Sequence, residues 1–236
     1  MTVPATVPLF RQFVDDELLR APMLFDQVLE AVFDGSRRKL AGLNGTQRNA
    51  VGDMLRSAQA QRAQLSDCFV HSLREQVQAE LGQPHPPGTG APKGPRPHSR
   101  ALALVDEDEV AAEIELSHLI EAIKNSAEYE LRELQTFVAA VVGDFDMARG
   151  HNPFRPAAYA RATWAAAQAL PLSRGHQVAF MRECAEPLAL LLRTSYAAST
   201  SRLERQGVEP AAYRTLVLPT GSRSGAPWVL STFSPE

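Results

Sequence analysis

The sequence predicts an all-α protein, an antiparallel helical bundle of about six to eight helices. Apolar residues recur at three- and four-residue spacings over long stretches, as one buried face of a helix requires. Glycine and proline stand where these stretches stop, and the short run Leu216–Leu218 is the only weak strand candidate. The chain has 236 residues, 44% of them hydrophobic, which is enough to bury one large core or two small ones.

Residues 1–81 predict an N-terminal helical hairpin built from two or three helices. Residues 8–34 carry apolar side chains at mixed three- and four-residue spacings, and Pro22 within them predicts a break or a restart of the helix. Asn44-Gly45 marks a turn. A second helical run ends in five apolar residues spaced by four, namely Leu65, Phe69, Leu73, Val77 and Leu81.

Residues 82–100 predict a flexible linker. This stretch contains six of the 17 prolines and four of the 14 glycines, and it lacks large apolar side chains. Such a segment buries too little surface to offset the entropy lost on ordering. The residues 219–236, rich in Gly, Ser and Pro, predict a disordered C-terminal tail.

Residues 101–218 predict a second helical bundle. From Leu116 to Val141 the apolar positions repeat about every 3.6 residues, which predicts one amphipathic helix over residues 106–142 that ends near Gly143.

Further along the chain, prolines and a glycine mark the helix ends. Pro156 is placed to start the next helix, Ser173 to cap another, and Gly207 to end it. Pro187 predicts a kink or a split within that last helix.

Charge is spread unevenly over the chain. The formal net charge of -3 argues against a general affinity for nucleic acid. Residues 101–150 hold 3 basic and 12 acidic residues, a net charge of -9, whereas residues 151–236 hold 9 and 5, a net charge of +4. Two interpretations follow: the two regions neutralise each other inside one bundle, or the acidic helix presents an interaction face to another protein. Glu113, Glu121 and Glu128 represent that face.

The sequence contains no recognisable catalytic set and no cofactor motif. Metal sites in helical bundles need two Glu-x-x-His motifs, and only Glu115 and His118 form one, so these two are the nearest candidates for metal ligands. Cys68 and Cys184 cannot make a disulfide scaffold and are predicted to be inert thiols in a reducing compartment. With neither a secretory signal nor a membrane span in the sequence, we expect a cytoplasmic protein.

Four short motifs, in order, resemble a bacterial family catalogued as domain of unknown function 1631. Residues 101–110 are similar to that family's Leu-x-Leu-Val-Asp-x-Asp/Glu-Glu signature, and residues 130–134 to its Glu-Leu-x-x-Leu. Residues 152–156 and 207–210 look like its Asn-Pro-x-x-Pro and Gly-Val-x-Pro. The likeness covers roughly residues 20–215, and three of the motifs (residues 101–110, 152–156 and 207–210) are typical of helix caps and connections.

Three functional hypotheses follow from these residues and from the resemblance. The first is a non-enzymatic helical scaffold or adaptor that binds another protein, in a pathway linked to cyclic di-GMP because some family members carry a PilZ domain for that nucleotide. The second is an enzyme, either the thymidine phosphorylase of some family labels or a metal-dependent oxidase. The phosphorylase would need a phosphate-binding loop and an α/β domain that the sequence does not show. The third is a truncated remnant without independent activity, and self-association through residues 106–142 is left open.

Overall fold

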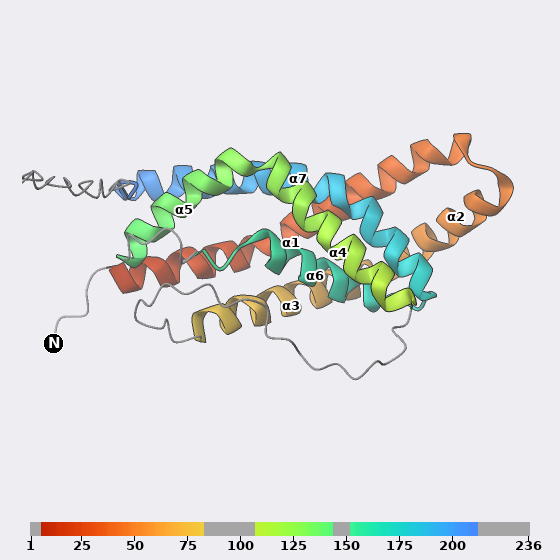
Figure 1. Cartoon of the computed structure of the whole chain (residues 1–236), viewed down its shortest axis with the longest axis horizontal. Helices are drawn as coiled ribbons and strands as arrows, with labels where there is room; N and C mark the ends of the chain where they lie inside the picture. Colours follow the sequence, from red (N-terminus) through yellow and green to blue (C-terminus); the bar gives the residue numbers. More distant parts are fainter. Residues whose placement is uncertain (1–5, 83–106, 144–151, 212–236) are drawn as a thin grey trace, which may run out of the picture.

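The computed structural model describes residues 6–82, 107–143 and 152–211, and these ranges fold into helices without any strand. The α-helices are α1 (Thr6–Lys39), α2 (Gly45–Ala60), α3 (Arg62–Gly82), α4 (Glu107–Ser126), α5 (Glu128–Val142), α6 (Pro156–Gln168) and α7 (Arg174–Arg205) (Figure 1). The predicted all-α bundle is confirmed. Several predicted features lie outside the described residues, namely nearly all of the linker, Asp106, Leu216–Leu218 and the C-terminal tail.

Neither internal proline ends its helix. The expected break at Pro22 is wrong, because α1 runs unbroken from Thr6 to Lys39. Ala21 and Phe25, on either side of this proline, are both buried, so packing holds the helix where one backbone hydrogen bond is lost. Likewise, α7 is not split at Pro187.

The predicted helix over residues 106–142 is divided into α4 and α5 at Ala127. This residue leaves helical geometry, with φ −121° and ψ 24°, and its side chain is fully buried. Hydrogen bonds continue on both sides: the Ala127 amide donates to the Ile123 carbonyl (3.0 Å) and the Leu131 amide to the Ala127 carbonyl (2.8 Å). The apolar repeat passes through this position without a proline or glycine, which is why the sequence does not reveal the bend.

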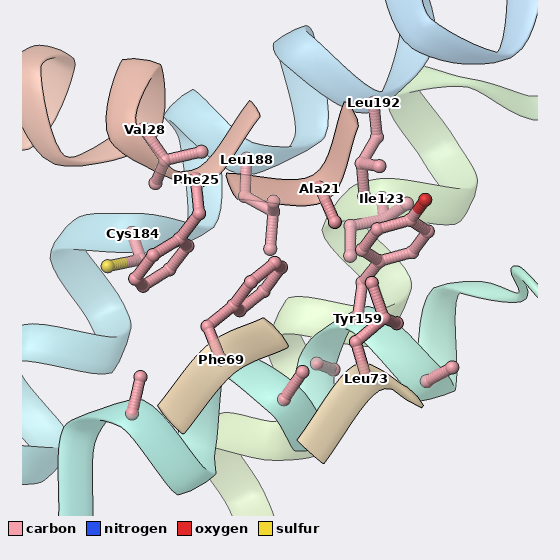
Figure 2. Close-up of a cluster of buried hydrophobic side chains, with 14 of the residues drawn as sticks. Ala21, Phe25, Val28, Phe69, Leu73, Ile123, Tyr159, Cys184, Leu188 and Leu192 are labelled. Carbon is pink, nitrogen blue, oxygen red and sulfur yellow. The ribbon is translucent and has the colours of Figure 1, made fainter. Parts of the chain in front are cut away.

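A central helix, α7, organises the bundle. It packs against α1, α4, α5 and α6, while α3 lies against α1 and α6. The sequence left open whether the helices before and after the linker pack together, and they share one core. In that core Phe25 of α1 stacks on Phe69 of α3 with 4.1 Å between ring centroids, and Tyr159 of α6 lies beside Phe69 at 6.4 Å (Figure 2).

The helices run in two directions along α7. α1 is antiparallel to it, because Glu17 pairs with Arg202 and Lys39 with Glu183. α4 and α5 run parallel to it instead (Figure 1). Glu115 of α4 pairs with Arg182, and Glu130 of α5 pairs with Arg193 further along α7 (3.5 Å). In chain order α6 lies between α5 and α7 and connects these two parallel helices.

Two glycines end helices in the left-handed conformation, as the sequence predicted. Gly143 has φ 76° after α5, and Gly207 has φ 80° after α7. At the second end, the Gly207 amide donates to the Glu204 carbonyl (2.9 Å) and the Val208 amide to the Leu203 carbonyl (3.1 Å). These two bonds define a Schellman motif, so the Gly-Val-x-Pro sequence acts as a helix stop.

We predict that Gly207→Ala lowers the free energy of unfolding by about 1 kcal/mol, because an L side chain is strained at positive φ. Gly35→Ala is the matched control: Gly35 lies inside α1 with open space around its Cα. That change should raise stability by about 0.5–1 kcal/mol, since alanine favours helix. Urea denaturation of both variants measures the difference, and equal effects would contradict the role of the left-handed cap.

Candidate functional site

The predicted acidic face lies on the solvent side of α4 and α5. Glu113, Glu121 and Glu128 are all exposed. Two of them have cationic neighbours on their own helix: Glu121 Oε1 lies 2.8 Å from Lys124 Nζ, and Glu128 Oε1 lies 3.3 Å from Arg132 Nη2. We call the surface that carries Glu113, Glu121 and Glu128 the α4–α5 face.

A shallow groove of about 390 Å³ runs along the α4–α5 face at the Ala127 bend. Residues from both helices line it, namely Glu121, Lys124, Asn125, Glu128, Leu131, Arg132 and Gln135. Its lining is mainly polar and charged, which suits a polar contact more than a small apolar ligand.

Large apolar side chains stand exposed on the same two helices. Tyr129, next to Glu128, is 73% exposed, and Ile114, next to Glu113, is 48% exposed. Tyrosine is enriched in protein–protein interfaces because it offers a large contact area together with a hydroxyl. Carboxylates next to exposed apolar groups make this face a candidate protein-binding surface.

On the side of α4 and α5 that faces α7, arginines of α7 pair with glutamates. Arg182 Nε donates to Glu115 Oε1 (3.0 Å), and a second guanidinium nitrogen reaches the same oxygen. This hydrogen bond raises the pKa of Arg182, and Glu130 pairs with Arg193. The two interpretations of the charge distribution therefore apply to different residues, since some acids neutralise the basic C-terminal helix and others face solvent.

The metal candidates Glu115 and His118 are close but differently engaged. His118 Nδ1 lies 3.9 Å from Glu115 Oε2, while the other carboxylate oxygen of Glu115 accepts hydrogen bonds from the guanidinium of Arg182. Within residues 6–82, 107–143 and 152–211, no group of three His, Cys, Asp or Glu side chains is placed to hold a metal ion. The buried carboxylate of Glu115 instead links α4 to Arg182 of α7.

A polar cluster that the apolar pattern did not predict connects α1 with α7. Glu17 is only 5% exposed, and it accepts hydrogen bonds from Ser199 Oγ (2.9 Å) and from the guanidinium of Arg202. A signal was present, because Glu17 stands four residues from both Phe13 and Ala21 in the apolar stripe of α1. A charged residue in such a stripe indicates a buried partner on another helix.

Tyr196 and the Asn-Pro-x-x-Pro motif lie next to this cluster. Burial and the nearby charge of Glu17 raise the pKa of the Tyr196 hydroxyl, so it stays protonated and donates to the Phe154 carbonyl (3.0 Å). Asn152 Oδ1 accepts the Phe154 amide (3.0 Å), and Arg155 pairs with Glu80 of α3. The motif thus links α3 to α7, through Arg155 on one side and the Phe154 carbonyl on the other.

We predict that Glu17→Ala lowers the free energy of unfolding by about 3 kcal/mol, because it leaves the charge of Arg202 partly buried without its partner. Glu75→Ala, an exposed change on α3, should stay within about 0.5 kcal/mol of the unaltered protein. Urea denaturation gives both values. Similar losses in the two variants would show that the Glu17 cluster adds no special stability.

The two cysteines differ in exposure. Cys184 is fully buried, and burial raises the pKa of its thiol, whereas Cys68 is half-buried. The predicted burial is therefore confirmed at Cys184 and is only partial at Cys68.

We expect iodoacetamide to leave Cys184 unmodified in the folded protein, since the reactive thiolate is suppressed and the side chain is enclosed. Peptide mass spectrometry before and after unfolding in urea measures this. Modification of Cys184 in the folded protein at the rate seen in urea would contradict the enclosed position.

The described residues form an all-α bundle in which the Asn-Pro-x-x-Pro sequence connects helices and the Gly-Val-x-Pro sequence ends one. The chain belongs to the DUF1631 family: the model of "Protein of unknown function (DUF1631) N-terminal domain" matches residues 18–207. The resemblance drawn from the four motifs is thereby confirmed. Comparisons with curated proteins and with solved structures find no significant match. None of the described helices combines the length and apolarity needed to cross a bilayer.

Proposed function

We propose that this protein is a non-enzymatic helical scaffold or adaptor that binds another protein through the α4–α5 face. The observation that carries the proposal is the joint exposure of Glu113, Glu121 and Glu128 with Tyr129 and Ile114 on two helices whose other side is buried against α7. A rigid backing of this kind presents the face with little loss of entropy on binding.

The ion pairs on the face do not oppose this role. Lys124 and Arg132 lie on the same helices as their partners and are exposed, so each pair contributes roughly 0.3–0.5 kcal/mol. Basic groups of a partner can replace such pairs at small cost. The preferred partner is therefore a protein with a basic, partly apolar surface, and its binding should weaken with salt.

The combined variant Glu113→Gln, Glu121→Gln, Glu128→Gln tests the proposal by crosslinked affinity capture from the protein's own cells, followed by mass spectrometry. We expect a partner captured by the unaltered protein to be recovered at least tenfold less with this variant, because three attractive charges are removed. A parallel capture in higher salt should show the same loss.

The matched control carries the same charge change elsewhere: Asp67→Asn, Glu75→Gln and Glu204→Gln, all at exposed positions outside the α4–α5 face. It should capture the partner as the unaltered protein does. Equal capture by both triple variants would reject the α4–α5 face, and capture of no partner at all would count against an adaptor.

We place this role in the cytoplasm and in a pathway linked to cyclic di-GMP, a link that rests on the family resemblance. Capture from cells with raised and lowered levels of that nucleotide tests the link. Recovery of the chain itself as the stoichiometric partner would instead assign the face to a homo-oligomer.

A further inference from the structure

An apolar groove opens at the end of the bundle where α3 and α5 finish and α1 begins. It has a volume of about 460 Å³ and is lined by Phe10, Arg11, Val14, Asp15, Leu81, Val141 and Val142. We call it the α1–α3–α5 groove. Val14 and Val141 at its base are buried members of the main core, whereas Leu81 at its edge is 48% exposed. The groove therefore reaches side chains of the main core.

The edge of the groove carries one residue of each charge. Arg11 and Asp15 are both exposed, and within the described part of the chain neither forms an ion pair. An occupant with apolar side chains and a charged neighbour would meet both the base and the edge of the groove.

The described chain ends beside the groove. The Ala211 amide donates to the Thr136 carbonyl of α5 (3.1 Å), and Ala211 is buried. Thr136 precedes Val141 by five residues, so the groove begins about 7.5 Å further along α5. An extended chain advances about 3.3 Å per residue, which brings the next few residues within reach.

We propose that the α1–α3–α5 groove binds residues 213–218 of the same chain, Tyr-Arg-Thr-Leu-Val-Leu. This segment begins two residues after Ala211, and Leu216–Leu218 are the first run of aliphatic side chains that follows. Arg214 supplies a positive charge for Asp15. The residues after Leu218, Pro-Thr-Gly-Ser, are poorly suited to an apolar groove. The proposal concerns the far end of the bundle and stands independently of the α4–α5 face.

Limited proteolysis with trypsin tests the docking on the full chain, because Arg214 lies in the segment and Arg223 lies beyond it. Cleavage rates in the folded protein are divided by those in urea to remove sequence preferences of trypsin. We expect cleavage after Arg214 to be about tenfold slower than after Arg223, since only the released segment can enter the protease. Equal normalised rates would overturn the proposal.

Two substitutions should abolish this protection: Leu81→Asp in the groove and Leu216→Asp in the segment. Leu19→Asp is the control, because Leu19 is an exposed residue of α1 outside the groove lining. Protection that survives Leu216→Asp would overturn the docking. Protection that increases with protein concentration would assign the groove to the segment of a second copy and would likewise overturn docking within one chain.

Discussion

The structure depends on the burial of α7 among four other helices. Its 32 residues bury side chains along the whole length, from Val178 to Leu203, and α1, α4, α5 and α6 each cover part of its surface. Most of the stability of a helix covered in this way comes from packing and less from its intrinsic helix propensity. The same burial explains why Pro187 fails to split it.

Polar pairs then fix how each neighbour is aligned along α7. The Glu17–Arg202 and Lys39–Glu183 pairs set α1 antiparallel, while the Glu115–Arg182 and Glu130–Arg193 pairs set α4 and α5 parallel. Apolar contacts are not directional, so charge pairs of this kind choose among alignments that bury similar areas. Glu115 and Glu130 pair with α7 in this way, whereas Glu113, Glu121 and Glu128 face solvent.

This division of acidic residues connects the fold to the proposed adaptor role. Two family motifs, residues 152–156 and 207–210, fix a helix connection and a helix end, as the Tyr196–Phe154 bond and the Gly207 cap show. Their positions hold the bundle together rather than gather reactive groups. The α4–α5 face, by contrast, combines charge with exposed aromatic area.

The sequence by itself determined the helical class, most of the helices and their end signals, because periodicity, proline and glycine act locally. It also located the acidic face, since Glu113, Glu121 and Glu128 fall outside the apolar repeat. Tertiary structure alone decided that Pro22 lies within a helix, that Ala127 bends one, and that Glu17 is buried against Arg202. Each of these depends on a partner helix far away in the chain, and local spacing does not identify that partner.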